Sequence, residues 1–346
     1  MGEKLKWALI GCGPRSHDHV KACLATGLYE VPAIADIDAA KVKEFGDAYD
    51  CTRRYSDYRQ MLAQERGLDV VHLVTLASLR KAPIEAAIAA GTKAIVIEKP
   101  MALDYAEARG LVETCQRANV LLVVNHQIRL MKEWVRLRER IADGTLGQVT
   151  AMRASVYGNL ISQGTHLFDL AWSVLGEPEI KWVFAGCEDR VGEVPQHPGP
   201  RNSLVLCEFG NGTRATFAVG NDSPETPNAR MVWMWFNMQV KGTKGSAECQ
   251  LDRGYYRWDL EGNLVERLPS GWDDECQGAA QAELSTNVAR ALRDPNYKHP
   301  QRGEAALVSF ALVEAACRSA RNGGKTIHFP LDTSENALAH WSRQKA

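Results

Sequence analysis

The sequence predicts two domains, an N-terminal α/β domain with a doubly wound parallel sheet and a C-terminal α+β domain with a large, mainly antiparallel open sheet. Two observations support this prediction. Short apolar runs alternate with helical segments over the first 125 residues, and longer strands separated by Gly and Asn turns follow. A chain of 346 residues has a length that suits two domains. We expect the domains to span residues 1–125 and 126–346.

The first domain is predicted from apolar runs that are too short for helices and lack polar alternation. Such runs are typical of strands that are covered on both faces. They lie at residues 5–10, 31–35, 69–76, 94–97 and 120–124. Helical segments stand between them, which favours a parallel sheet because parallel strands need a crossover. The clearest of these helices are expected at 17–26, 38–49 and 105–118, with an Ala-rich one ending at 90.

The second domain is predicted from a change of rhythm after Asn125. Turn signals such as Asn211-Gly212 separate strands with alternating polarity, as hairpins require. The strands are expected at 149–157, 203–209, 214–219, 232–240, 246–251 and 255–260. Helices are expected at 131–142, 165–175, 279–293 and 304–322. We therefore expect an antiparallel sheet with helices on one face.

Composition and charge exclude several classes of partner. Hydrophobic residues make up 45% and charged residues 24% of the chain, and the formal net charge is −1. This balance gives no clustered basic surplus, so no nucleic-acid or membrane partner is expected. No His, Cys and carboxylate cluster has the spacing of metal ligands, so no metal is expected.

The cysteines and the N-terminus favour a cytoplasmic protein. The nine cysteines are scattered and none stands at CxxC spacing, as in proteins that keep reduced thiols. The chain runs from Lys4 directly into the first apolar run, which leaves no room for a signal peptide. We therefore expect a cytoplasmic location.

A glycine motif follows the first predicted strand and opens the first helix. It reads Gly11-Cys12-Gly13-Pro14-Arg15-Ser16. Gly11 allows a tight turn and Gly13 allows the backbone to approach a pyrophosphate, which then faces the free N–H groups of the helix start. The motif alone is weak, but its place between strand and helix predicts a dinucleotide-binding site at Gly11, Gly13, Pro14 and Arg15.

Asp36 stands at the end of the second apolar run, at the distance from the glycines where a ribose-binding acid is expected. Its carboxylate would accept hydrogen bonds from ribose hydroxyls and repel a 2′-phosphate. Ile37 beside it adds no positive charge. NAD is therefore favoured over NADP, although Arg15 has the length to reach a 2′-phosphate and keeps NADP open.

The fourth apolar run ends in Glu98-Lys99-Pro100. This puts Lys99 at the carboxyl edge of the sheet, where open α/β sheets bind their ligands. A partly desolvated lysine there has its pKa lowered and can exchange a proton with a hydroxyl group. Chemistry alone leaves the alternative of a solvated surface lysine open.

These motifs, taken in order, resemble those of the glucose-fructose oxidoreductase and inositol dehydrogenase family (Gfo/Idh/MocA). The resemblance continues beyond Glu98-Lys99-Pro100 and runs from about residue 5 to 176. Its later motifs are Asn125-His126-Gln127-Ile128-Arg129, Gly144-Thr145-Leu146-Gly147 and Gly164-Thr165-His166-Leu167-Phe168-Asp169. It implies a Rossmann domain followed by the α+β domain of this family.

The resemblance also implies roles for individual residues. Lys99 resembles the catalytic lysine of the family, and His166 resembles its proton acceptor or relay. Asp169, one turn later, resembles an orienting partner. Glu98 is similar to the residue that contacts the nicotinamide ribose. The remaining cofactor contacts are expected at Thr75, Leu76, Lys99 and Asn125.

Three departures from the family pattern affect this prediction. Ser162 stands where the family often has an Asp, which leaves Lys99 and His166 as the proton-transfer residues. The segment from Thr75 to Arg80 lacks the usual Thr-Pro-Asn-x-x-His, so only backbone contacts are expected there. The segment between the strand ending near Tyr157 and the helix at Thr165 is short, which predicts a pocket that is either more open or closed by the 196–201 loop or a neighbouring subunit. Polar residues nearby are the candidate substrate contacts, namely Arg129, Tyr157, Asn159, Gln163 and Asp169.

The sequence thus predicts an NAD(P)-dependent oxidoreductase that acts on a secondary hydroxyl or ketone of a sugar, cyclitol or derivative. Two alternatives stay open. One is an NAD-dependent redox glycosidase, which oxidises, eliminates and reduces with bound cofactor, and the other is a dinucleotide-sensing regulator without catalysis. The exposed sheet face of the second domain predicts a homodimer or homotetramer.

Overall fold

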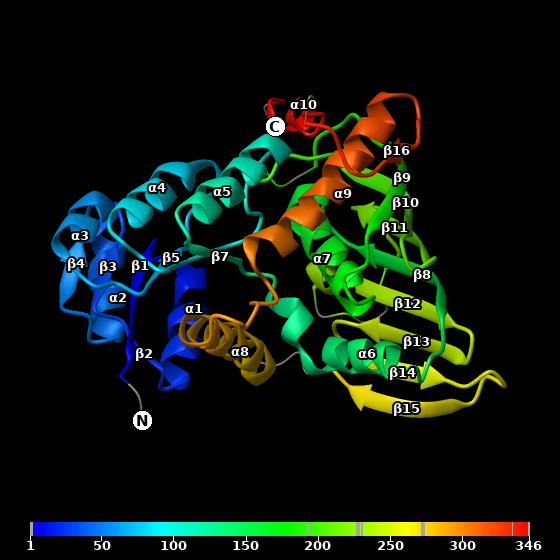
Figure 1. The fold of residues 1–346 in the computed structure, drawn as a ribbon, viewed down its shortest axis with the longest axis horizontal. Helices are drawn as coiled ribbons and strands as arrows, with labels where there is room; N and C mark the ends of the chain where they lie inside the picture. Colours follow the sequence, from blue (N-terminus) through cyan, green and yellow to red (C-terminus); the bar gives the residue numbers. More distant parts are fainter. Residues whose placement is uncertain are drawn as a thin grey trace. The chain divides into compact units, whose positions relative to one another are not determined.

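The computed structural model describes residues 3–192, 194, 196–225, 229, 231–270, 274–333 and 335–344. It confirms the predicted fold class, with one parallel sheet and one mixed, mostly antiparallel sheet (Figure 1). The chain divides into two compact units. The first comprises residues 1–102, 107–127 and 278–307, and the second comprises 103–106, 128–277 and 308–346.

The first unit includes residues 278–307, which the sequence analysis assigned to the second domain. Hydrogen bonds tie this late segment to the parallel sheet. The Tyr29 hydroxyl donates to the Ser285 carbonyl at 2.6 Å, and the Val124 amide donates to the Gln301 carbonyl at 3.0 Å. Because β7 has no neighbouring strand on its outer side, residues near Gln301 satisfy the backbone groups that this edge exposes.

The sheet of the first unit has the strand order β4-β3-β1-β5-β6-β7, with all strands parallel and β2 paired to β1. Chain order reverses between β1 and β5, which is where open α/β sheets bind ligands. The strands are β1 Leu5–Ile10, β2 Tyr29–Glu30, β3 Ala33–Ala35, β4 Arg53–Tyr55, β5 Val70–Leu73, β6 Ala94–Ile97 and β7 Leu121–Val124. The helices between or after them are α1 Pro14–Ala25, α2 Ala39–Ala48, α3 Tyr58–Gln64, α4 Lys81–Ala89, α5 Tyr105–Arg117 and α8 Asp274–Arg293.

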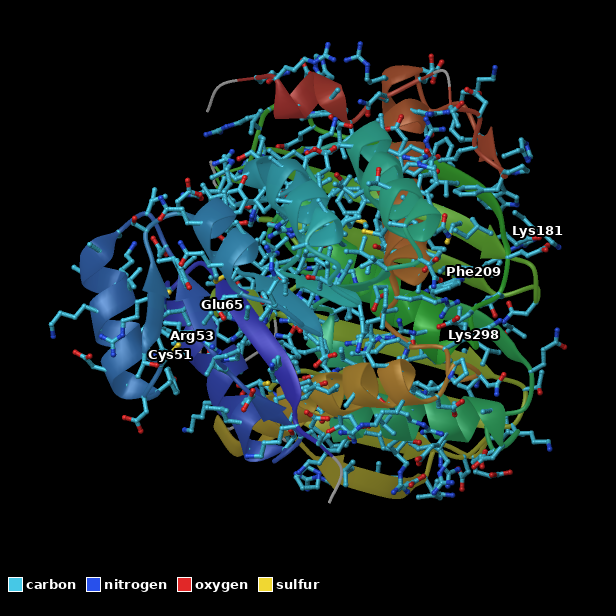
Figure 2. The ribbon with its side chains drawn as sticks, turned by 60° about the vertical axis from the view of Figure 1, so that its left-hand side comes forward. Cys51, Arg53, Glu65, Lys181, Phe209 and Lys298 are labelled. Atoms are coloured by element: carbon cyan, nitrogen blue, oxygen red, sulfur yellow. The ribbon has the colours of Figure 1, made fainter. Side chains whose placement is uncertain are left out.

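Apolar packing fixes the glycine turn in place. Leu9 of β1, Val20 of α1, Ile34 of β3 and Phe45 of α2 form one buried cluster. The outer strand β4 is polar instead, and Figure 2 labels Arg53 and Glu65 at this edge, 3.2 Å apart as an ion pair. Charged side chains on an edge strand oppose pairing with another chain.

The sheet of the second unit has the order β15-β14-β13-β12-β8-β11-β10-β9-β16. Only the β8–β11 pair is parallel among its described strand pairs. The strands are β8 Val149–Val156, β9 Ile180–Cys187, β10 Asn202–Phe209, β11 Arg214–Gly220, β12 Phe236–Gly242, β13 Gly245–Gln250, β14 Gly254–Trp258, β15 Leu264–Pro269 and β16 Ile327–His328. The helices of this unit are α6 Lys132–Ala142, α7 Thr165–Val174, α10 Ala339–Ser342 and, from residue 308 on, α9 Gly303–Arg321.

The strand predicted at 232–240 begins later than expected. Residues Val232–Met234 form a 3₁₀ turn, and β12 starts at Phe236. The last residue pair between β12 and β8 joins Phe236 to Val156, and beyond it the Tyr157 amide still donates to the Trp235 carbonyl at 3.0 Å. No helix in the described part of the chain is both long and apolar enough to cross a membrane.

Candidate active site

The glycine turn after β1 has the geometry that a bound dinucleotide requires. Gly11 has φ +99°, and a Cβ at this position would lie 2.5 Å from the Val74 carbonyl oxygen. A Cβ at Gly13 would meet nothing within 4 Å, so the space above it is open. The Ser16 hydroxyl donates to the Gly11 carbonyl at 2.6 Å. The turn is therefore held close to β5 while Gly13 leaves room for a phosphate at the start of α1.

Asp36 lies beside this turn at the end of β3. Its carboxylate accepts hydrogen bonds from the Cys12 amide at 2.7 Å and from the Asp38 amide at 2.9 Å. These two bonds fix the orientation of the carboxylate next to the glycine turn. Ile37 follows with 94% of its surface exposed. An exposed apolar side chain next to a fixed carboxylate suits an adenosine and adds no cation for a 2′-phosphate.

Arg15 follows the glycine turn in the first turn of α1, and its side chain lies beside Asp18 and Glu98. Its guanidinium pairs with Asp18 at 2.9 Å and approaches Glu98 to 3.7 Å. The side-chain amide of Gln127 is oriented so that its nitrogen donates to the Asn125 carbonyl at 3.0 Å and its oxygen accepts from Arg15 Nη2 at 2.9 Å. Arg15 is therefore engaged near β6 rather than beside Asp36.

Glu98 is the centre of a buried polar cluster at the carboxyl end of β6. Its Oε1 lies 2.6 Å from His19 Nε2 and accepts from Asn125 Nδ2 at 2.7 Å. Burial of Glu98 opposes its ionisation. The hydrogen bonds from His19 and Asn125 and the nearby charges of His19 and Arg15 outweigh burial and hold the pKa of Glu98 well below its usual range. The carboxylate is thus ionised and fixed in one orientation.

Lys99 follows Glu98 and is half-buried. Burial lowers the pKa of the Lys99 amine, Glu98 opposes that shift, and the charges of Arg15 and Arg80 add to it. The Lys99 amide donates to Glu98 Oε2 at 3.2 Å, which links the backbone of the lysine to the fixed carboxylate. A lysine whose pKa is lowered in this way gives up its proton more readily than a solvated lysine does.

The first unit contains all of the predicted cofactor-binding residues, and they lie at or after the carboxyl ends of β1, β3, β5, β6 and β7. Two buried side-chain atoms there have no partner among the described residues, Thr75 Oγ1 and Asn125 Oδ1. Leu76 is 51% exposed. An open glycine turn, a fixed acid and two buried polar atoms in need of a partner fit a nicotinamide dinucleotide at this edge.

The second unit contains His166 and the candidate substrate residues. His166 lies in the first turn of α7 and is buried. Arg129 is also buried and contacts Asp169 at 3.3 Å, Ser173 Oγ at 3.0 Å and Glu177 at 3.0 Å. Arg129 and Asp169 are thus brought together as an ion pair that anchors α7, the helix that carries His166.

Asn159 and Ser162 shape the turn before α7, which is one turn of π-helix, η3 Leu160–Gly164. Asn159 Oδ1 accepts from the amides of Ile161 and Ser162, and its Nδ2 donates to the His197 carbonyl at 2.8 Å. These contacts give Asn159 a capping role. Tyr157 packs edge-on against Trp235, with ring centroids 5.5 Å apart. Gln163 is half-buried in the same turn.

Sequence reasoning missed His19, Arg80 and Gln127 as parts of the site. His19 is separated from Glu98 by 79 residues, and spacing alone gives no signal for such a contact. Its neighbour His17 faces Phe45 and Tyr49 instead. This agrees with the rule that residues two apart on a helix do not share a face.

Comparison with known proteins identifies the two parts of the chain. The model of the oxidoreductase family with an NAD-binding Rossmann fold (GFO_IDH_MocA) matches residues 5–126, and that of its C-terminal α/β domain matches residues 150–329. The chain is 28% identical to the D-apiose dehydrogenase of Paraburkholderia graminis, over 93% of this chain and 89% of that protein. It is 31% identical to the trans-1,2-dihydrobenzene-1,2-diol dehydrogenase of Macaca fascicularis, over 69% and 78% of the two chains.

Solved structures share the fold. An oxidoreductase from Agrobacterium radiobacter, in complex with NAD+, L-tartaric acid and magnesium, superposes with a TM-score of 0.81 at 23% identity, over 94% of this chain and 98% of that one. An inositol dehydrogenase homologue from Azotobacter vinelandii, complexed with NADH and myo-inositol, gives a TM-score of 0.79 at 20% identity, over 95% and 98%.

Proposed function

Because the chain belongs to the Gfo/Idh/MocA oxidoreductase family, we propose that it transfers a hydride between NAD and a secondary hydroxyl, or the matching ketone, of a sugar, cyclitol or derivative. The observation that carries this proposal is Lys99, a half-buried amine with a lowered pKa next to the fixed Glu98 carboxylate. The names of the relatives specify a sugar and a diol, which supports a polyhydroxylated substrate.

In the proposed reaction the neutral Lys99 amine accepts the hydroxyl proton as the carbon gives up its hydride, and it returns the proton in the reverse direction. The bound nicotinamide supplies the hydride acceptor when oxidised and the donor when reduced. Glu98 and Asn125 hold the nicotinamide end of the site, and Gly11 and Gly13 give room to the phosphates. His166 is proposed as the second proton-transfer residue, with Arg129 and Asp169 anchoring its helix.

The cofactor is proposed to be NAD rather than NADP. Asp36 presents a carboxylate fixed by two backbone amides, and Arg15 is engaged with Asp18 and Glu98. Replacing Asp36 with Ala removes the group that repels a 2′-phosphate. We expect the ratio of kcat/KM for NAD to that for NADP to fall by about 10- to 100-fold. Asp259→Ala is the control, since Asp259 lies in the turn between β14 and β15 of the second unit.

We also propose a homo-oligomer and a cytoplasmic location. The strands β9 and β10 expose Phe184 and Leu204 by 41% and 52%, and apolar side chains on an open sheet face favour pairing with a second copy. Light scattering of wild type and Leu204→Glu tests the pairing, and equal masses at monomer size would contradict it. The eight cysteines whose side chains the structure describes are all free, which supports a reducing compartment.

The function is tested by following nicotinamide absorbance with NAD and a panel of sugars, cyclitols and glycosides, with products analysed from the same wells. Lys99→Ala should lose at least about 100-fold in kcat. Lys81→Ala, an exposed lysine in α4, is the matched control. Lys99→Ala reducing NAD as fast as wild type would contradict the role of Lys99. A cleaved glycoside without net NADH would indicate the redox glycosidase, and no turnover of any kind would indicate the sensor.

A further inference from the structure

Arg80 is a buried guanidinium with no carboxylate partner in the part of the chain that the structure describes. It lies at the start of α4 and is 1% exposed. Its Nη2 donates to the Thr75 carbonyl at 2.9 Å, and its Nη1 donates to the Pro100 carbonyl. Thr75 lies in the turn after β5, and Pro100 lies in the turn after β6. One side chain therefore ties together the two turns that carry Thr75 and Lys99.

Arg80 joins these two turns through two acceptors. Both acceptors are backbone carbonyls, so the contact depends on the reach and the two-pronged shape of the guanidinium rather than on a charge pair. A buried arginine that donates only to neutral carbonyls has its desolvation offset only by more distant carboxylates, here Glu98 and Glu107. A charge kept at such a cost near an ionisable lysine requires an explanation beyond packing.

The charge of Arg80 acts on Lys99. Burial lowers the pKa of Arg80 from its usual value to about 10, with Glu98 and Glu107 opposing that shift, so the guanidinium stays protonated at neutral pH. Arg80 is among the groups that lower the pKa of Lys99, after burial and with Arg15. Glu98 acts in the opposite direction and favours the protonated amine.

We propose that Arg80 is a positioning residue for Lys99, which fixes the Lys99–Pro100 turn against the Thr75 turn and places at this turn a positive charge that disfavours protonation of the amine. The part of this inference that concerns catalysis rests on the proposed function of Lys99. The part that concerns the protonation of Lys99 does not, because it holds for the protein without substrate. Arg80 itself touches no reacting atom in this assignment.

Three substitutions separate the two contributions of Arg80. Arg80→Met removes both the hydrogen bonds and the charge. Arg80→Gln keeps a donor without the charge, and Arg80→Lys keeps the charge without the two-pronged bridge. Arg59→Met, an exposed arginine of α3, is the matched control.

The first measurement is made on the protein without cofactor or substrate. The rate of Lys99 acetylation by acetic anhydride is followed against pH, with the Lys99 peptide quantified by mass spectrometry and circular dichroism used to confirm folding. We expect the labelling midpoint of Lys99 to rise by about one pH unit in Arg80→Met and Arg80→Gln. It should rise less in Arg80→Lys and stay unchanged in Arg59→Met.

The second measurement is the pH profile of kcat/KM for the same variants with NAD and a substrate found by the panel. In Arg80→Met and Arg80→Gln the acidic limb of this profile should move to higher pH by the same amount as the labelling midpoint. In Arg80→Lys the acidic limb should stay almost unchanged while kcat falls. An unchanged labelling midpoint of Lys99 in folded Arg80→Gln overturns the inference. If Arg80→Met does not fold, Arg80→Gln alone decides the test. A shifted midpoint with an unmoved pH profile supports the electrostatic action of Arg80 and contradicts the proposed role of Lys99.

Discussion

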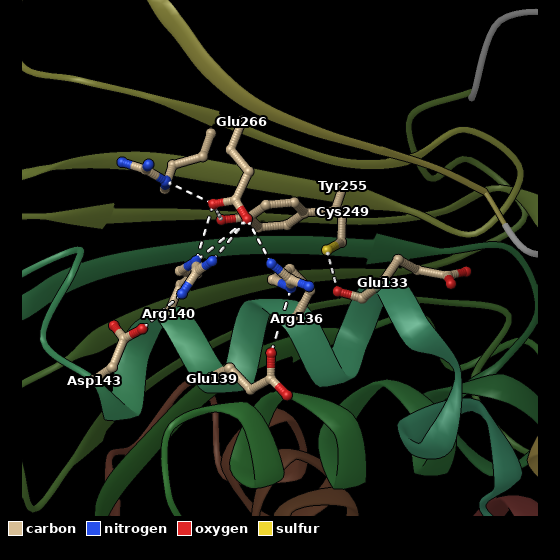
Figure 3. A network of polar contacts seen from close by, with 9 residues as sticks. Glu133, Arg136, Glu139, Arg140, Asp143, Cys249, Tyr255 and Glu266 are labelled. Atoms are coloured by element: carbon tan, nitrogen blue, oxygen red, sulfur yellow. Dashed lines mark hydrogen bonds and ion pairs between the residues drawn. The ribbon is translucent and has the colours of Figure 1, made fainter.

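Replacing Glu266 with Gln should weaken the second unit in a manner that depends on pH. Glu266 lies on β15, the outermost strand of the nine-stranded sheet. Its carboxylate accepts from Arg136 at 2.9 Å and from Arg140 at 3.0 Å, both on α6, and from Arg257 on β14 at 3.0 Å (Figure 3). One carboxylate thus holds an edge strand to a helix. Glutamine has the same shape and cannot pair with three cations.

The magnitude follows from the pKa of Glu266, which hydrogen bonds from Arg140, Arg257 and Arg136 lower from 4.5 to about 2 despite partial burial. A pKa shift of this size corresponds to a contribution of at most about 3 kcal/mol to the free energy of unfolding. The side chain is 18% exposed and screened by solvent, which reduces the expected loss to roughly 1–2 kcal/mol. The folded pKa lies below the unfolded one, so the stabilisation is complete above about pH 4.5 and is lost as the pH falls toward 2.

The assay compares urea unfolding of wild type, Glu266→Gln and the exposed turn variant Glu261→Gln at pH 7, 5 and 4. We expect a lower midpoint for Glu266→Gln at pH 7 and 5, and a smaller difference at pH 4. Glu261→Gln should match wild type throughout, since Glu261 forms no ion pair in the described structure. A midpoint difference that does not change with pH would refute the electrostatic reasoning, and no difference at pH 7 would refute the contribution of Glu266 altogether.

Two further predictions concern the site. Gly11→Ala should cost about 2 kcal/mol or more and weaken NAD binding measured by calorimetry, because φ is +99° and the added Cβ would lie 2.5 Å from the Val74 carbonyl. Gly27→Ala, with positive φ and open space, should leave NAD binding unchanged. Arg129→Met should lower the free energy of unfolding by about 3–5 kcal/mol, and with it the Tm, because Asp169 stays buried after losing its ion pair with Arg129. A changed KM without any change in Tm would instead assign Arg129 to substrate binding.

The central strands of the first unit could be predicted because both of their faces are covered, whereas the short strands β2 and β4 were not predicted. Leu5–Ile10, which is apolar apart from Lys6, and Ala94–Ile97 have the same bounds in sequence and structure, as expected for apolar runs in a buried parallel sheet. The strands β9 and β15 were not predicted. The outer strand β15 is mostly exposed, and an exposed edge strand has little apolar pattern to detect.

The backbone part of the site could be predicted, whereas its side-chain partners could not. The conformation of the Gly11 turn and the place of Asp36 beside it follow the expectation, because the spacing of this motif is tied to a fixed backbone geometry. The partners of Glu98 come from α1 and from the residue after β7, and only folding brings them together. Arg80 stands beside exposed Leu79 and Lys81, so its sequence context is that of a surface residue, and its burial follows from the carbonyls it contacts.

The chemistry at the end of β6 depends on how neighbouring charges oppose one another. Glu98 is held ionised by His19, Arg15 and Asn125, and an ionised carboxylate next to Lys99 favours the protonated amine. Burial and the two arginines favour the neutral amine. Acid–base sites typically contain neighbouring titratable groups whose surroundings shift their pKa values away from the usual ones. In the proposed function the fixed carboxylate orients a cofactor while the lysine moves a proton, and Arg15 and Arg80 add to the larger effect of burial on the lysine amine.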